Sequence, residues 1–469
     1  MSRSPAAQWW LVAAILAAPA LRAQGAAAPQ KQDEVLTVER VREVVSFLAA
    51  DELRGRQSPS PGLETAAQYV QDRWQQAGFA PGAAGAWRQR YTTPGQRLDS
   101  RSLELEVVLT EGEREEKVTL RGDADVRLLR AGATADGNAP RATVLRSGDS
   151  RLGRALGYGG GRTATLVEVS EQHPLWLDCA GEREAISRRL RGSAPVFLVR
   201  EGALAATAAV PTDVKASAPT AWSVSWRGAD AAAVDVELTN VVGVLRGAEL
   251  PDEYVLVSAH YDHVGIGAPV DGDAIYNGAD DDATGTTALV LLSELLARGP
   301  RPRRSVMLVA FSAEEKGLRG SAAFVAEPPV PLAAIVANVN IEMIGRPEEG
   351  SERAAWITGA EYSDFAAIAG PALQSKGIEL VDFPQARQLF AQSDNWSLAR
   401  MGVVAHSISA GSLHGDYHQP SDEVEKLDLP HMTAVIAGIE AVVRQLADRD
   451  GRPEYSEAGR AALERGRGR

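Results

Sequence analysis

From Asn240 onward, the chain alternates short apolar runs with longer amphipathic stretches. The apolar runs fit strands, and the longer stretches repeat their apolar residues at helical spacing. We expect strands at residues 254–259, 305–311, 335–341 and 402–408, and helices at residues 286–297 and 431–447. This alternation is typical of an α/β domain, in which helices cover the faces of a sheet.

Ionisable side chains gather directly after these apolar runs. The five blocks are residues 260–263 (His260, Tyr261, Asp262 and His263), 277–285 (with Asp280, Asp281 and Asp282), 312–317 (with Glu314 and Glu315), 340–345 (with Glu342) and 416–422 (with Tyr417 and His418). Open α/β sheets bind their ligands at the carboxyl ends of the strands. We therefore expect the five blocks to meet at one edge of the sheet.

Taken singly, each block has an ordinary structural explanation, such as a solvated turn, surface charge or a loop histidine. Packed together, so many carboxylates would repel one another unless a positive charge lay among them. Within these blocks, Lys316 is the only basic residue directly beside an acid pair, so a divalent metal is the simplest explanation. A mixed set of imidazole and carboxylate ligands favours Zn²⁺, with Mn²⁺ or Co²⁺ as possible substitutes, over Ca²⁺ or Mg²⁺.

The order of the blocks resembles that of the M28 family of zinc metallopeptidases. The resemblance rests on His-x-Asp, Asp-Asp-x-Thr-Gly, Glu-Glu, Asn-x-Glu-Met-Ile-Gly and Tyr-His-x-Pro-x-Asp, and it covers residues 36–95 and 236–447. It implies a zinc-aminopeptidase-like α/β fold with three layers, α/β/α, around a mixed, mainly parallel twisted sheet. We expect residues 33–100 and 236–447 to form the catalytic domain.

The resemblance implies two zinc ions in each chain. His260, Asp281 and Glu342 would hold one ion. Asp281, Glu315 and His418 would hold the other, so that Asp281 bridges both. The family usually has aspartate where this chain has Glu342, and the longer side chain puts the metal preference in question. Two ions that share a carboxylate also lower the pKa of their shared water toward neutrality.

The resemblance also implies three catalytic roles. Glu314 would be the general base that activates the water, Tyr417 would polarise the substrate carbonyl, and the Asp262 carboxylate would orient the imidazole of His260. Because the ligand set is then full, we expect three other histidines to line the pocket or lie in the core, namely His263, His406 and His414. Where the family often has Ser-Asp-His, this chain has Ser393-Asp394-Asn395.

Residues 101–235 have a different pattern, with short β-like runs between clusters of Gly, Asp and Arg. This pattern predicts a small β-rich inserted domain. It occupies the place where many M28 relatives carry a protease-associated domain. We expect residues 448–469, which are rich in Gly, Arg and Glu, to form a flexible tail.

Residues 1–23 are typical of a signal peptide, with Arg3, an apolar run over residues 9–20 and a final Ala23. The run is too short for a stable membrane span, which needs about 20 residues. We therefore expect an exported protein, periplasmic or extracellular. Its single cysteine, Cys179, cannot form an intramolecular disulfide.

The formal net charge of −13, from 49 Lys+Arg and 62 Asp+Glu, excludes a chain that coats nucleic acid. The leading hypothesis is an exported aminopeptidase whose partners are peptide substrates. One alternative is another enzyme of this fold, a carboxypeptidase or a glutaminyl cyclase-like acyl transferase with one zinc. A second alternative is a catalytically silent binding module, which we would expect to have lost ligands or the base.

Overall fold

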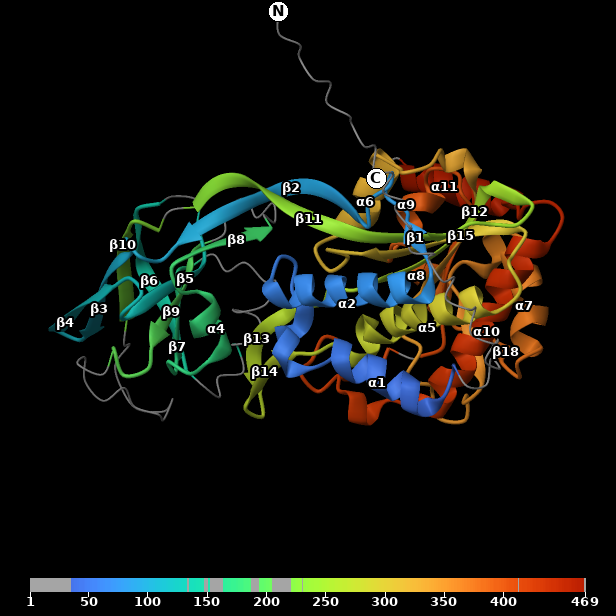
Figure 1. The fold of residues 1–469 in the computed structure, drawn as a ribbon. Helices are drawn as coiled ribbons and strands as arrows, with labels where there is room; N and C mark the ends of the chain where they lie inside the picture. The colour runs from blue at the N-terminus through green and yellow to red at the C-terminus, as the bar shows by residue number, and fades with distance from the viewer. Residues whose placement is uncertain are drawn as a thin grey trace, which may run out of the picture.

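A large mixed sheet forms the centre of the molecule (Figure 1). The computed structural model describes residues 35–132, 135–146, 151, 163–186, 194–204, 221–229, 231–411 and 413–467. Within these residues the main sheet has ten strands. In spatial order they are β18 (Glu379–Leu380), β17 (Ala354–Ile357), β19 (Ala405–Ser409), β16 (Ile335–Ile341), β12 (Leu250–His260), β15 (Arg304–Phe311), β11 (Ala231–Leu245), β2 (Arg88–Asp99) and β8 (Glu182–Ile186), with β1 (Ala80–Pro81) paired to β11.

The central strands of this sheet run parallel to one another. β12 pairs in parallel with β15 and with β16, and β16 pairs in parallel with β19. Strands β15 and β16 are buried along their whole length, because layers of helices lie on both faces. Parallel pairing places the carboxyl ends of these strands at one edge, as the sequence pattern predicts.

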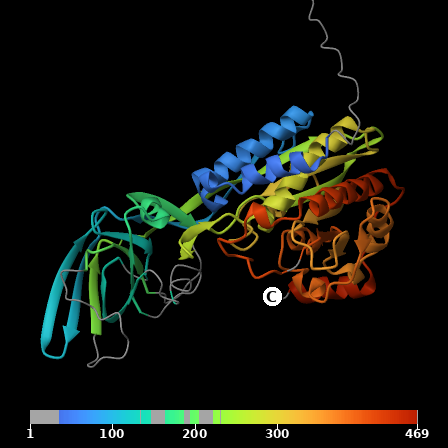
Figure 2. The same cartoon turned by 90° about the horizontal axis from the view of Figure 1, so that it is seen from below.

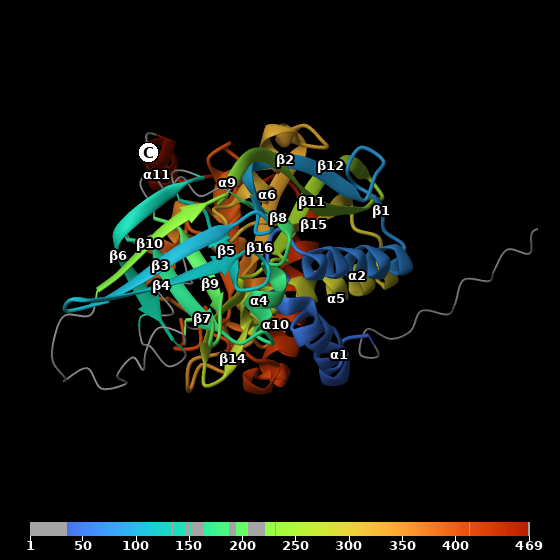
Figure 3. The same cartoon turned by 90° about the vertical axis from the view of Figure 1, so that its left-hand side faces the viewer.

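Helices cover both faces of the main sheet (Figures 1 and 3). One face carries α1 (Val38–Leu48), α2 (Pro61–Ala77), α5 (Thr284–Arg298) and α10 (Leu429–Asp448), which pack against one another. The other face carries α6 (Arg319–Ala326) and α9 (Asn395–Ala399). This part also contains α7 (Phe365–Gln374), α8 (Ala386–Leu389) and the short helical turns η2 (Asp51–Arg56), η3 (Ala279–Ala283), η4 (Leu332–Ala334), η5 (Ala360–Tyr362) and η6 (Val424–Lys426). The expected α/β/α fold is confirmed.

A second, smaller sheet lies apart from these helices (Figures 1 and 2). Its strands, in order, are β4 (Arg114–Arg121), β3 (Glu104–Glu111), β10 (Ala221–Arg227), β6 (Gly137–Leu145), β7 (Thr165–Val169), β9 (Val196–Arg200) and β5 (Val126–Arg130). A hydrophobic cluster that includes Leu105, Phe197 and Trp226 packs beneath it. The predicted β-rich insert is therefore present, and the long antiparallel pair of β2 and β11 connects it to the main sheet.

The insert also contacts the main part of the molecule through a hairpin. The hairpin consists of β13 (Gly265–Val270) and β14 (Asp273–Tyr276), and the short helix α4 (Pro174–Asp178) of the insert packs on it. Leu175 and Trp176 share one buried cluster with Ile266 and Ala268. The hairpin joins the block that contains His260 to the block that contains Asp281, so the insert lies close to the predicted site.

The two ends of the chain differ in what the structure describes. The predicted signal peptide, residues 1–23, lies outside the described residues. The prediction of a flexible tail over residues 448–469 is wrong for the described part, because α11 (Glu457–Arg467) follows Tyr455 and packs on the main core. Leu463 is 5% exposed, and the Tyr455 hydroxyl donates to Val403 O at 2.8 Å. No helix in the described ranges is both long and apolar enough to cross a membrane.

Candidate metal centre

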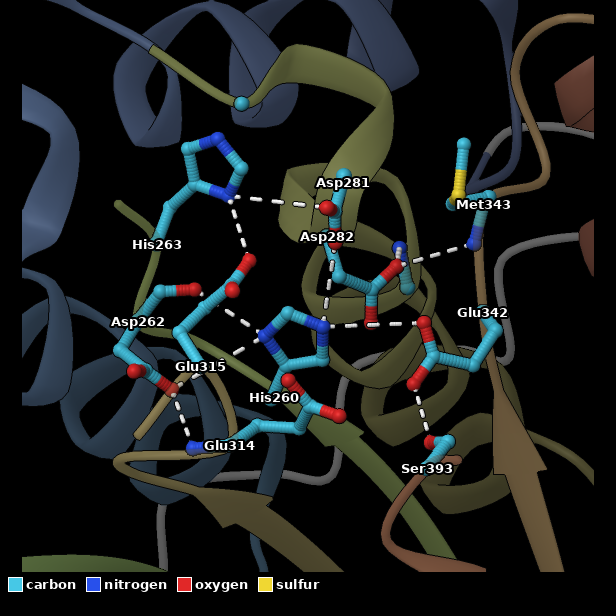
Figure 4. Close-up of polar contacts among 12 residues, drawn as sticks. His260, Asp262, His263, Asp281, Asp282, Glu314, Glu315, Glu342, Met343 and Ser393 are labelled. Atoms are coloured by element: carbon cyan, nitrogen blue, oxygen red, sulfur yellow. Dashed lines mark hydrogen bonds and ion pairs between the residues drawn. The ribbon is translucent and has the colours of Figure 1, made fainter. Parts of the chain in front are cut away.

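Four of the five polar blocks meet at the carboxyl edge of the main sheet in Figure 4, and His418 of the fifth block contacts Asp281 and Glu315 there. His260 is the last residue of β12, Glu315 follows β15, and Glu342 follows β16. Asp281 lies in η3 directly before α5, and His418 lies in the loop after β19. All five residues predicted as metal ligands are therefore brought together, in two groups that share Asp281.

The first group surrounds the imidazole of His260. Its Nε2 atom lies 3.2 Å from Asp281 Oδ1 and 3.6 Å from Glu342 Oε2. The three ligand atoms all lie within 4.8 Å of one another. Zinc bonds to nitrogen and oxygen are about 2.0–2.2 Å long, so one ion could contact all three side chains after small adjustments.

The second group is centred on Glu315. The Nε2 atom of His418 lies 3.0 Å from Glu315 Oε1 and 3.0 Å from Asp281 Oδ2. His263 joins this group, with its Nδ1 atom 3.1 Å from Glu315 Oε1. Asp281 thus presents one carboxylate oxygen to each group, which is the arrangement expected of a carboxylate that bridges two ions.

The ligand atoms of the second group fit a metal better than they fit hydrogen bonds. Four of these atoms are buried and have no hydrogen-bond partner of acceptable geometry, namely His263 Nδ1, Asp281 Oδ2, Glu315 Oε1 and His418 Nε2. Buried polar groups without partners are uncommon in folded proteins because they are costly. Two imidazoles and two carboxylates form a donor set that suits zinc.

Without metal, protons on His260 and His418 compensate the acids, because burial is outweighed by contacts with those acids, which raise the pKa of both imidazoles. Burial opposes protonation of His418, but its contacts with Asp281 and Glu315 outweigh burial and raise its pKa to about 10. Burial and the charge of Asp281 act to raise the pKa of Glu315, but its contacts with His263 and His418 lower it to about 2. A divalent cation at this position would take over the role of those protons.

Asp262 supports two neighbouring site residues. Its backbone carbonyl, rather than the carboxylate expected from the sequence, lies at hydrogen-bond distance from His260 Nδ1, at 3.0 Å. The carboxylate Oδ1 is 3.9 Å from that nitrogen and instead accepts a hydrogen bond from the backbone N–H of Glu314, at 3.0 Å. Donation from Nδ1 leaves His260 Nε2 free to bind a metal.

Glu314 lies beside both groups but belongs to neither. Burial raises the pKa of the Glu314 carboxyl well above its usual value, and the nearby charge of Glu315 adds to the effect. Glu315 points toward His263, whereas Glu314 points in a different direction in Figure 4. The two adjacent glutamates can therefore serve different purposes, as the sequence predicts.

The side chain of Glu342 is held by Ser393, in the Ser393-Asp394-Asn395 segment that stands where the family often has Ser-Asp-His. The Ser393 hydroxyl donates a hydrogen bond to Glu342 Oε1 (Figure 4). Asn340 Nδ2 in turn donates to Ser393 Oγ at 2.8 Å. Because Oε1 is engaged in this way, Oε2 is the oxygen that faces His260. The longer glutamate side chain is thus fixed with one oxygen toward the candidate metal position.

Residues 240–443, which contain all five polar blocks, match peptidase family M28. This region of the chain belongs to peptidase family M28. Its boundaries begin in β11 and end in α10, so the M28 region holds every ligand of the two groups. The β-rich insert precedes it in the sequence.

Curated relatives of the M28 region match over short segments. A probable zinc metalloprotease of Pyrenophora teres f. teres (strain 0-1) is 32% identical over 118 residues, which are 25% of this chain and 25% of the relative. A probable glutamate carboxypeptidase of Arabidopsis thaliana is 36% identical over 111 residues, which are 23% of this chain and 14% of the relative. The chain thus matches about a quarter or less of the length of these relatives.

Solved structures match over nearly the whole chain. A zinc aminopeptidase from Bacillus subtilis has a TM-score of 0.54 at 15% sequence identity, and the match covers 88% of this chain and 96% of that one. An aminopeptidase from Aneurinibacillus sp. strain AM-1 has a TM-score of 0.50 at 16% identity, with 91% and 97% covered. At such low identity these matches show the fold alone.

Tyr417 lies at the rim of the M28 site. Its ring stacks on the His418 imidazole, with centroids 4.0 Å apart and an angle of 17° between the planes. The residue is 41% exposed. Burial of the hydroxyl and the nearby acids raise the pKa of Tyr417, so the phenol stays protonated and can donate a hydrogen bond. Its predicted role toward a substrate carbonyl is compatible with this position.

Two residues of the M28 site were missed by sequence reasoning. His263 was expected in the pocket lining or the core, but its Nδ1 atom lies among the ligand atoms of the second group. The spacing His-x-x-His could have indicated it. Arg56 lies outside the M28 region and is 1% exposed, with Asp262, Asp281 and other acids nearby. No local motif marks it as part of the site.

The other two histidines differ in their surroundings. His406 lies in the core, where Thr358 O and Ser363 Oγ are each 2.7 Å from a ring nitrogen. The Nε2 atom of His414 lies 3.2 Å from Asp280 Oδ2. Neither belongs to the two candidate ligand groups among the described residues.

Proposed function

We propose that this protein is an exported zinc-dependent aminopeptidase that removes N-terminal residues from peptides through a dinuclear site. One observation carries the proposal: the two oxygens of Asp281 face two different groups of candidate ligands. A bridging carboxylate between two such groups supports two ions at close distance. Membership in a peptidase family supports peptides as the substrate class.

Two bound zinc ions would supply Lewis acidity to the substrate carbonyl and lower the pKa of water. Glu314 would accept a proton from the attacking water and deliver it to the nitrogen of the leaving amine. This role needs a carboxylate that is close to the ligands but does not bind metal. Glu314 meets the requirement, because its backbone is fixed by Asp262 and its side chain belongs to neither ligand group.

Tyr417 would donate a hydrogen bond to the carbonyl oxygen of the scissile peptide as negative charge develops there. A hydrogen-bond donor directed at that oxygen stabilises the transition state more than the ground state, because the negative charge on the oxygen is larger in the transition state. Because the Tyr417 ring stacks on the His418 imidazole, the phenol is held at a fixed position beside the second ligand group. Removal of the hydroxyl should therefore reduce kcat more than it raises KM.

A carboxypeptidase is the alternative with specific support, because a relative of the M28 region is a probable glutamate carboxypeptidase. Both reactions use the same hydrolytic chemistry at a peptide carbonyl. They differ in which charged terminus of the substrate is recognised. The two ligand groups of the site favour either peptidase over an acyl transferase with one zinc.

The experiment that tests the proposal is digestion of a peptide library, read by mass spectrometry, together with elemental analysis of the purified protein. We expect two zinc ions per chain and loss of residues from free N-termini, with N-acetylated peptides left intact. Prior treatment with a chelator should abolish the cleavage. Loss of residues from the C-terminus would favour the carboxypeptidase. Absence of bound zinc would favour a binding module.

Export is part of the proposal and rests on residues 1–23. Expression of the full chain in a bacterial host, followed by fractionation and N-terminal sequencing, tests it. We expect the protein in the periplasm or the medium, beginning near Gln24. An intact N-terminus on protein that stays in the cytoplasm would contradict export without affecting the proposed chemistry.

A further inference from the structure

Arg56, the last residue of η2, connects the two loops that carry the candidate ligands. Its Nε atom donates to Tyr261 O at 3.0 Å, directly after His260. Its Nη1 atom donates to Asn277 O at 2.8 Å and its Nη2 atom to Gly278 O at 3.1 Å, just before η3. Nη1 also donates to Leu48 O at the end of α1. One guanidinium therefore joins three separate segments.

The residues around Arg56 contact the same loops. Its own carbonyl accepts a hydrogen bond from His263 N at 3.2 Å. Two residues further on, Ser58 Oγ accepts from Ala313 N at 3.1 Å, directly before Glu314. Residues 56–58 thus contact three of the ligand-bearing loops, those that carry His260, Asp281 and Glu315.

Gly55 shows how closely this segment approaches the hairpin between the ligand loops. Its φ is +65°, and a Cβ atom added there would lie 2.4 Å from Tyr276 O and 2.6 Å from Gly265 O. These contacts are with backbone atoms, which cannot move aside cheaply. The close approach holds the segment of Arg56 against the hairpin and limits how far the hairpin and its two ends can shift.

Arg56 is also a buried positive charge among acids. It is 1% exposed. Burial lowers the pKa of its guanidinium to about 10, while the charges of Asp262, Asp281, Asp282 and Asp422 oppose this effect. The residue therefore stays charged near neutral pH. An arginine can make several directed hydrogen bonds at once because its donors lie in a rigid plane, whereas a lysine presents one flexible ammonium.

We propose that Arg56 and the adjoining Ser58 are positioning residues for the dinuclear site: before metal binds, Arg56 fixes the distance between the His260 loop and the Asp281 loop, and Ser58 fixes the Glu315 loop beside them. This inference rests on the proposed zinc site. Removal of a group that orients metal ligands typically lowers metal affinity by about 10–100-fold. The backbone hydrogen bonds predict that a positive charge alone cannot replace Arg56.

The test uses Arg56→Lys, which keeps the positive charge but loses the planar set of N–H donors that contacts several carbonyls at once. The matched control is Arg304→Lys, because Arg304 is 4% exposed and also donates to backbone carbonyls, those of Arg449 and Gly451, at the opposite end of the sheet. Both variants should lose thermal stability. By competition with a zinc chelator, we expect zinc affinity to fall by about 10–100-fold in Arg56→Lys and to stay within about twofold of wild type in Arg304→Lys.

Wild-type affinity for both ions in Arg56→Lys would overturn the inference while leaving the proposed function intact. Wild-type protein that binds no zinc would contradict both. If Arg56→Lys does not fold, Ser58→Ala provides the second variant, since it removes a single hydroxyl that accepts from Ala313 N. We expect Ser58→Ala to weaken the ion bound by Glu315 and not the other. Unchanged affinity for both ions in that variant would also overturn the inference.

Discussion

The two carboxylate oxygens of Asp281 face different histidines: Oδ1 lies 3.2 Å from His260 Nε2, and Oδ2 lies 3.0 Å from His418 Nε2. These histidines belong to blocks separated by more than half of the M28 region. The parallel strands bring both blocks to the same edge of the sheet. Among the candidate ligands in the described residues, Asp281 is therefore the one side chain that contacts both metal positions.

Asp281→Asn should lose both zinc ions, because the neutral amide cannot bridge two cations. His418→Ala should lose at most one ion, the one that it shares with His263 and Glu315, because His260, Asp281 and Glu342 remain to hold the other. Elemental analysis of dialysed protein measures the difference. Equal zinc content in the two variants would contradict the shared role of Asp281.

The stability of the metal-free protein should decrease as pH rises. The pKa of His418 is raised from 6.5 to about 10 in the folded state. The stabilisation from its protonated form is thus complete below pH 6.5 and is lost as pH approaches 10. Burial raises the pKa of Asp394 to about 7, so this residue also stabilises the fold at lower pH and loses that contribution as pH rises through 7.

Thermal unfolding at pH 6 and pH 9, with chelator and with excess zinc, measures this dependence. Without metal, Tm should be lower at pH 9. With zinc the decrease should be small, because the ions and not protons then compensate the acids. A metal-free Tm that is equal or higher at pH 9 would contradict the assigned protonation of His418.

Ser393→Ala should weaken the ion at His260 and Glu342 while sparing the other. The variant removes the hydrogen bond that fixes Glu342 Oε1 and leaves Oε2 free to turn away from His260. An effect of about 10–100-fold on the affinity for one ion is expected. Ser375→Ala, at an exposed hydroxyl directly after α7, is the matched control. Equal weakening of both ions in Ser393→Ala would argue for a general loss of structure.

The sequence was sufficient to predict the order of the ligand blocks and their meeting place. Each block follows an apolar run, and the carboxyl ends of parallel strands lie at one edge of a sheet. The sequence pattern therefore predicts that His260, Glu315 and Glu342 lie close together. Arg56 could not be predicted in the same way. Its hydrogen bonds are to backbone carbonyls, which every residue type has, so no motif marks its partners. Arg56 also lies more than 200 residues from Tyr261 in the sequence.

The C-terminal segment was mispredicted for a related reason. Its Gly, Arg and Glu content is typical of a solvated tail, but Tyr455 and Leu463 are enough to attach it to the core. Composition reports the average character of a segment, whereas docking depends on a few apolar side chains and hydrogen bonds.

His263 was set aside because five ligands already completed the expected set.

Tyr455→Phe should destabilise the protein by about 1–3 kcal/mol, because it leaves a buried carbonyl without its donor. The hydroxyl donates to Val403 O at 2.8 Å and accepts from Ala405 N at 3.2 Å. Urea unfolding of the zinc-loaded variant measures the change, and zinc content should match wild type. Stability equal to that of wild type would show that α11 does not depend on this contact.

The most direct test of the proposed chemistry is the kcat of Glu314→Gln loaded with zinc. The variant keeps every metal ligand but removes the carboxylate that accepts the proton. We expect two zinc ions per chain, as in wild type, and a decrease in kcat for N-terminal cleavage of about 10²–10⁴-fold. A kcat close to that of wild type, with both ions bound, would contradict the role of Glu314 as general base.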